Sequence, residues 1–179
     1  VVVVGGQSYP IPFNDGTSVL TAELWDPVSE TFTRLPAMKV PRNYHSVALL
    51  LPDARVLSAG GGLCGQGCAA NHADAQIFSP HYLFNADGTP AVRPVITTAP
   101  AAVAYGKPME VRTDGAVAAF SLVRLSSTTH TVNNDQRRVA LRFERSGENA
   151  YAVSAPTNPG WALPGLYMLF AMNEQGVPS

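Results

Sequence analysis

Short apolar segments separated by turn residues dominate the chain. Two apolar runs, residues 1–4 (VVVV) and 47–51 (VALLL), are followed directly by glycine or proline. Segments of this length, bounded by turn residues, are typical of β-strands. Neither run approaches the roughly 20 apolar residues of a membrane-spanning helix, so we expect no membrane partner. Residues 1–4 read as a strand with no initiator Met before it, so we expect a piece of a longer protein.

Two strand patterns recur in the same order along the first half of the chain. A strand that runs into consecutive glycines occurs at residues 1–6 and again at 55–62. A strand that carries an aromatic residue and ends at proline occurs at residues 22–27 and again at 73–80. A period of about 50 residues is typical of kelch β-propellers, which have four strands per blade. The alternative at this stage is two unrelated hairpins.

The pattern changes after a turn-rich stretch at residues 85–90 (NADGTP). We therefore predict a first domain over residues 1–84 and a second over 91–179. The second part alternates short apolar strands with turns, as in an immunoglobulin-like β-sandwich. The candidate strands are residues 109–112, 118–125, 138–145, 150–154 and 165–173.

Composition supports an all-β protein. The 179 residues include 15 prolines spread along the sequence, and proline ends helices. The hydrophobic fraction of 46% is enough to bury a core, whereas only 14% of residues are charged. The formal net charge is −1, which gives no electrostatic basis for binding nucleic acid or an anionic membrane.

Candidate metal ligands occur in two separate places. Tyr44 and His45 lie directly before the apolar run at 47–51, and His130 follows the polar stretch 126–129 (SSTT), which could form a hairpin tip. Imidazole and phenolate groups suit copper. Neither the Tyr-His pair nor a lone histidine in a Ser/Thr loop is specific by itself.

Several longer words in the right order resemble the galactose oxidase and glyoxal oxidase family of copper radical oxidases. The resemblance runs from about Gly5 to Ser179 and implies the last blade or blades of a seven-bladed kelch propeller followed by an immunoglobulin-like domain. The remaining propeller would then be a partner of this chain. The words are RNYHS (42–46), LLLPD (49–53), GGGLCG (60–65), NHADAQIF (71–78), THTVNNDQRR (129–138), ALPG (162–165) and MLF (168–170).

The resemblance implies roles for four residues. Tyr44, His45 and His130 match the family's ligands to one copper ion, and Tyr44 also matches its catalytic base. Phe13 matches a substrate-contacting aromatic, although a hydrophobic loop anchor explains it equally well. The family's protein radical, a tyrosine cross-linked to a cysteine, has no match here and is expected upstream.

The implied function is that of a secreted, extracellular oxidase. Such an enzyme oxidises primary alcohols, galactose among them, or aldehydes with O₂ and releases H₂O₂. Because the radical half of the site is missing, residues 1–179 alone are predicted to be inactive. The alternative function is a non-catalytic module that binds carbohydrate or protein, since both folds also serve that purpose.

The only two cysteines are Cys64 and Cys68. The family resemblance implies a disulfide between them, although three residues separate them here where relatives usually have two. An even cysteine count also fits an oxidising compartment. Half of a zinc site with His72 is the competing interpretation, but it lacks a fourth ligand. His72 and His81 receive no ligand role from the resemblance and are expected to be structural or surface residues.

Overall fold

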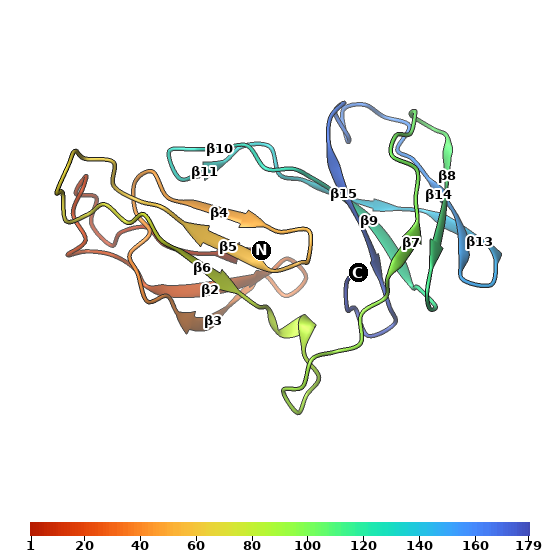
Figure 1. Cartoon of the computed structure of the whole chain (residues 1–179), viewed down its shortest axis with the longest axis horizontal. Coiled ribbons are helices and arrows are strands. Elements are labelled where there is room, and N and C mark those ends of the chain that lie inside the picture. Colours follow the sequence, from red (N-terminus) through yellow and green to blue (C-terminus); the bar gives the residue numbers. More distant parts are fainter. The chain divides into compact units, whose positions relative to one another are not determined.

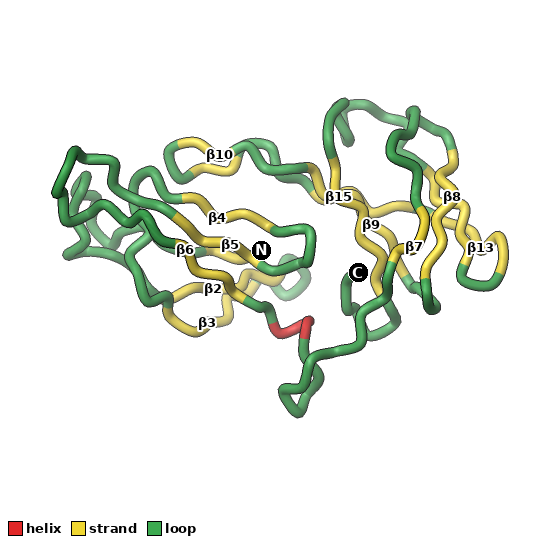
Figure 2. Tube along the Cα trace, viewed as in Figure 1, coloured by secondary structure: helices red, strands yellow, loops and turns green.

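The computed structural model describes residues 1–179 and divides into two compact units. The first unit comprises Val1–Leu51, Arg55–Phe78 and Ser126–Asn134, and the second comprises Pro52–Ala54, Ser79–Leu125 and Asp135–Ser179. Figure 2 shows that helix is confined to one short segment, the 3₁₀ turn η1 (His81–Leu83). No helix in the chain has the length and apolar character needed to cross a bilayer. The all-β prediction is confirmed.

The first unit contains two three-stranded antiparallel sheets (Figure 1). In each sheet the spatial order of the strands follows their order in the sequence. The strands are β1 (Val2–Val3), β2 (Thr21–Asp26) and β3 (Thr31–Ala37) in one sheet, and β4 (Val47–Leu50), β5 (Val56–Ala59) and β6 (Ala75–Phe78) in the other.

The sequence repeat has a structural counterpart. β1 and β5 both end at consecutive glycines, and each pairs antiparallel with the aromatic-bearing strand that follows its glycines, β2 or β6. The third strand, however, lies on different sides: β3 flanks β2, whereas β4 flanks β5. If β1 and β2 are superposed on β5 and β6, the two sheets together outline a repeat of four strands. Each sheet would then lack one strand of that repeat, the first sheet the counterpart of β4 and the second the counterpart of β3. Four-stranded blades and a closed propeller remain predictions.

The polar stretch before His130 forms the expected hairpin. β10 (Thr128–Thr129) pairs antiparallel with β11 (Val132–Asn133), so that His130 and Thr131 form the tip. This hairpin is part of the first unit and lies against β4 (Figure 1). It therefore brings residues from late in the sequence beside the Tyr44 segment.

The second unit is a sandwich of two antiparallel sheets with seven strands. One candidate strand, residues 138–145, is two strands: β12 pairs with β9 and β13 pairs with β14, so the chain changes sheets at Arg142. Such a bend is how a strand turns the corner of a sandwich. The sheets have the orders β12 (Arg138–Leu141), β9 (Ala119–Arg124), β15 (Tyr167–Met172), and β13 (Phe143–Gly147), β14 (Ala150–Ser154), β8 (Pro108–Thr113), β7 (Ile96–Thr98).

Apolar side chains from both sheets form the core of the second unit. Residues of β8 alternate between exposed and buried, so that Met109 and Val111 point inward as a half-solvated strand requires. Phe120 from the other sheet meets the Tyr151 ring edge to face, at a centroid distance of 5.2 Å. The Tyr151 hydroxyl in turn accepts a hydrogen bond from the Val117 amide at 2.9 Å. The immunoglobulin-like strand arrangement and the domain limits at 84 and 91 remain predictions.

Candidate metal centre

Tyr44 and His45 occupy a turn directly before β4. The Ser46 amide donates to the Asn43 carbonyl at 3.0 Å and closes the turn, while His45 adopts a φ of 68°. The Gly62 amide donates to the Tyr44 carbonyl at 2.8 Å, which ties the turn to the glycines after β5. The Tyr44 side chain remains partly exposed.

Arg42, directly before this turn in the chain, anchors it through buried hydrogen bonds. Arg42 is 2% exposed, and its Nη1 donates to the Gly60 carbonyl (2.9 Å) and to Asp74 Oδ1 (3.1 Å). The Arg42 carbonyl accepts from the Gly6 amide at 2.8 Å. A Cβ atom at Gly5 would lie 2.3 Å from that carbonyl oxygen, so only glycine fits there. The glycine-ended strands β1 and β5 thus hold the Tyr44 turn on two sides.

Phe13 lies on a loop that one side chain braces. Gln7 Nε2 donates to the Ile11 carbonyl (2.9 Å) and to the Asn14 carbonyl (2.6 Å), one before and one after Phe13. Phe13 has a φ of 55°, and its ring centroid lies 5.5 Å from that of Tyr44 and 6.3 Å from that of His45.

The hairpin tip brings His130 to the same cluster. Its ring centroid lies 5.6 Å from Tyr44 and 5.7 Å from His45, and the Tyr44 and His45 centroids are 3.8 Å apart. The structure therefore gathers Phe13, Tyr44, His45 and His130 from three separate segments of the first unit.

Hydrogen bonds to both imidazoles leave the same nitrogen free. His45 Nδ1 lies 2.7 Å from the Gly62 carbonyl, which can only accept, so the neutral ring carries its proton on Nδ1. His130 Nδ1 lies 2.7 Å from Thr129 Oγ1. Metal-binding histidines are typically oriented by such a bond from the nitrogen that does not bind the metal. Both Nε2 atoms thus remain available as ligands.

The donor set fits copper. Two imidazoles and a phenolate oxygen are ligands that Cu(II) accepts. No three His, Cys, Asp or Glu side chains in the chain converge at metal-binding spacing, and the third possible donor beside the two imidazoles is the phenol of Tyr44.

Several residues of the cluster have a strained backbone. Phe13, His45, His130 and Thr131 all have φ between 51° and 68°, a region that costs a non-glycine residue roughly 1–2 kcal/mol. Residues held in this way cluster at functional sites, where the surrounding structure fixes them. These are four of the eight non-glycine residues with positive φ in the chain, and three of them, Phe13, His45 and His130, belong to the aromatic cluster.

A small polar cavity of about 140 Å³ lies beside the turn that carries Tyr44 and His45. Arg42, Ser46 and Ser58 line it together with Thr131 of the hairpin tip. Arg42 Nε and Nη2 are buried and have no hydrogen-bond partner within the chain. Arg42 is a residue that sequence reasoning missed, although its place two residues before Tyr44 was visible.

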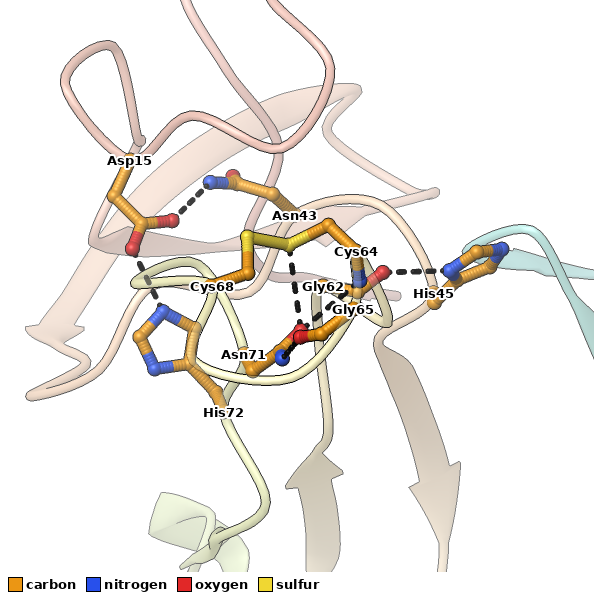
Figure 3. Close-up of a disulfide and its surroundings, with 9 residues drawn as sticks. All are labelled: Asp15, Asn43, His45, Gly62, Cys64, Gly65, Cys68, Asn71 and His72. Carbon is orange, nitrogen blue, oxygen red and sulfur yellow. Dashed lines mark hydrogen bonds and ion pairs between the residues drawn. A yellow bond between two sulfur atoms is a disulfide. The ribbon is translucent and has the colours of Figure 1, made fainter.

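The disulfide between Cys64 and Cys68 is present, in the loop that follows the glycines (Figure 3). A disulfide sulfur has no thiolate to offer, so the half zinc site with His72 is wrong. His72 is half-buried, and its Nε2 lies 2.8 Å from Asp15 Oδ2. His81 is exposed on η1.

Comparison with known proteins identifies the family. A family model described as "Galactose oxidase-like, Early set domain" matches residues 93–179. Galactose oxidase from Gibberella zeae is 48% identical over 178 residues, which cover 99% of this chain. The chain belongs to the galactose oxidase-like family.

Other members of the galactose oxidase-like family match as well. An aldehyde oxidase GLOX from Vitis pseudoreticulata is 37% identical over 167 residues and 86% of this chain. The solved structure of a fungal alcohol oxidase of the AA5 family, in complex with copper, matches 99% of this chain with a TM-score of 0.94 and 51% identity. This chain spans 26% of the Gibberella protein, 31% of the Vitis protein and 38% of the solved chain.

Proposed function

We propose that this chain is the C-terminal part of a secreted copper radical oxidase and supplies Tyr44, His45 and His130 to one copper ion. The observation that carries the proposal is the convergence of these three rings from distant segments, with both imidazole Nε2 atoms free. Relatives named as galactose, aldehyde and alcohol oxidases support a primary alcohol or aldehyde as the substrate.

The chain's residues have separate roles in the proposed reaction. Bound copper would supply a Lewis-acidic position for the substrate oxygen and accept one electron. The Tyr44 phenolate oxygen receives the proton of the substrate hydroxyl, while His45 and His130 fix the metal and Phe13 borders the substrate. Overall, an alcohol and O₂ give an aldehyde and H₂O₂.

The second electron requires a further redox group. Both cysteines of this chain are joined in a disulfide, so neither can form a thioether with a tyrosine. We place that cross-linked tyrosine in the rest of the protein, together with the remaining propeller blades. Residues 1–179 alone therefore produce no H₂O₂ in this proposal. The disulfide also supports secretion, because such bonds persist in oxidising compartments.

Replacing His130 in the full-length protein tests the proposal. We expect His130→Ala to lower copper content well below one ion per chain and to reduce H₂O₂ production at least about 100-fold, since even the loss of a residue that only orients a ligand costs about 10–100-fold. Tyr44→Phe should retain more copper but lose about 10²–10⁴-fold in rate, because the proton acceptor is gone.

His81→Ala is the matched control, since it removes an exposed histidine outside the cluster. Copper content is measured by elemental analysis and peroxide by a coupled peroxidase assay. Full copper loading and activity in His130→Ala would overturn the proposal. No observation in the structure favours the alternative of a non-catalytic binding module.

A further inference from the structure

We propose that Asp15 and His72 are positioning residues that tie together three segments of the first unit. These segments are the Phe13 loop (residues 7–18), the ligand turn (residues 43–46, which hold Tyr44 and His45) and the disulfide loop (residues 61–72). This inference rests on the proposed function. It assigns a role to His72, which neither the sequence words nor the metal cluster explains. It also predicts that a residue outside the ligand cluster controls both substrate binding and the copper environment.

Asp15 uses its two carboxylate oxygens in two directions (Figure 3). Oδ1 accepts a hydrogen bond from Asn43 Nδ2 at 3.1 Å, and Oδ2 lies 2.8 Å from His72 Nε2. The side chains of Asp15 and His72 are 29% and 18% exposed, so solvent competes only partly for these bonds. One carboxylate thus joins three segments of the first unit.

Asn43 connects this carboxylate to the ligands. It is 8% exposed and stands directly before Tyr44 in the chain. Its Nδ2 also reaches the Asn14 carbonyl (3.3 Å) and Ser18 Oγ (2.8 Å), so one amide group contacts the Phe13 loop at three points. The Phe13 loop and the ligand turn are therefore held as one piece.

His72 connects the carboxylate to the other side of the site. Its backbone amide donates to the Gly61 carbonyl at 3.1 Å, and the next residue, Gly62, presents the carbonyl that holds His45 Nδ1. The contacts close a ring that runs from His45 through Gly62, Gly61, His72, Asp15 and Asn43 and returns along the backbone to His45.

The disulfide loop braces the Gly62 side of this ring. Asn71 Oδ1 accepts from the Cys64 amide at 3.1 Å, and Asn71 Nδ2 donates to the Gly65 carbonyl at 2.7 Å (Figure 3). The Cys64–Cys68 bond closes the same loop. His72 therefore projects from a stiffened segment, and a stiff support is what lets a single contact set the position of Asp15.

Two consequences follow from this closed chain of contacts. Phe13 is two residues from Asp15, so loss of the carboxylate frees its ring to move relative to Tyr44, and misplacement by about 1 Å can cost about 100-fold. Loss of the His72–Asp15 contact removes one side-chain tie of the segment that carries the Gly62 carbonyl, the acceptor that orients His45, whereas the backbone bond between His72 and Gly61 remains. Outer contacts of this kind are worth about 10–100-fold in metal affinity or activity.

The experiment uses the full-length protein, copper titration with electron paramagnetic resonance of Cu(II), and steady-state kinetics on a primary alcohol. We expect Asp15→Ala to raise KM about tenfold, to lower kcat less than about threefold, and to weaken copper binding about tenfold with an altered Cu(II) spectrum. His72→Ala should reproduce the copper effects with a smaller change in KM, because Asn43 still holds the Phe13 loop.

Asp26→Ala is the matched control, because that carboxylate, at the exposed end of β2, also accepts two hydrogen bonds, from the Val28 amide (2.9 Å) and Ser29 Oγ (3.0 Å). If Asp15→Ala does not fold, Asp15→Asn replaces it. Its amide offers one acceptor oxygen to two donors, so KM should still rise about threefold.

Unchanged KM and Cu(II) spectrum in folded Asp15 variants would overturn this inference while leaving the proposed function intact. The same holds if only the melting temperature falls, since that outcome indicates a merely structural role. Absence of copper binding by the wild-type protein would instead defeat the proposed function, so the two failures are distinguishable.

Discussion

The two units of the chain are stabilised by different interactions. In the second unit, Val111, Phe120, Tyr151 and Val153 are at most 1% exposed and form one apolar core. In the first unit, the only buried hydrophobic side chains are those of Ala22 and Ala70, and the largest buried side chain is Arg42. The second unit therefore has the core of an independent domain, whereas hydrogen bonds and glycine contacts hold the first.

This difference affects how the candidate site works. Sheets of repeat architectures bury their faces only against neighbouring repeats. Phe32 and Ile77 in the first unit are 60% and 50% exposed, as expected for faces that such neighbours would cover. The candidate ligands thus lie in the unit with the weaker apolar packing, and their geometry depends on polar contacts such as those of Arg42 and Asp15.

Two phenylalanine replacements, one in each unit, should differ most in their effect on stability. Phe120→Ala empties a core position that is 1% exposed and should destabilise the second unit by about 3–5 kcal/mol. Phe32→Ala removes a ring that is 60% exposed and should change stability by less than about 0.5 kcal/mol. Denaturant unfolding can be followed by the fluorescence of Trp161 in the second unit and Trp25 in the first. Equal losses in both variants would show that the first unit has a core of its own.

The strands were predictable where local signals are strong. Apolar runs ended by glycine predicted β1 and β5, and the Ser/Thr stretch predicted the β10–β11 hairpin. The prediction of one strand over residues 138–145 was wrong because no glycine or proline marks the change of sheet at Arg142. A corner of this kind is set by the packing of two sheets, which a local pattern does not contain.

The site was predictable only in its centre. Tyr44, His45 and His130 were found because they stand in distinctive words, and the structure brings them together. The contacts among Asp15, Asn43 and His72 were not predicted, because they join residues 28 and 57 positions apart with no local period. Polar residues that support a site through such long-range contacts look, in sequence, like ordinary turn residues.

Alanine replacements of Gly62 and Gly65 test whether the disulfide loop positions the carbonyl that orients His45. A Cβ atom at Gly62 would lie 2.2 Å from the Ala70 carbonyl oxygen, whereas one at Gly65 would meet nothing within 4 Å. Both residues have positive φ, so each alanine variant carries backbone strain of about 1–2 kcal/mol. Only Gly62→Ala should displace the carbonyl that orients His45, and it should weaken copper binding about tenfold or more. Isothermal titration of both variants with Cu(II) measures this, and equal affinities would contradict the role of Gly62.

The smallest expected effect concerns Tyr82 of the second unit and alkaline pH. Burial raises the pKa of Tyr82 above its ordinary value, with Asp53 acting in the same direction and Arg93 against it, and the hydroxyl donates to the Ala54 carbonyl at 2.6 Å. Because the folded state holds the proton more tightly than the unfolded state, this contribution is complete below pH 10 and is lost as the pH rises from there through the raised pKa. Wild type should therefore lose more stability than Tyr82→Phe between pH 9 and 11, and other groups that titrate there cancel in the difference. The loss should appear in the Trp161 signal and not in that of Trp25, since Tyr82 and Ala54 both belong to the second unit. A matching response from Trp25 would mean that the two units unfold together. The units would then differ in how their side chains pack but not in their stability.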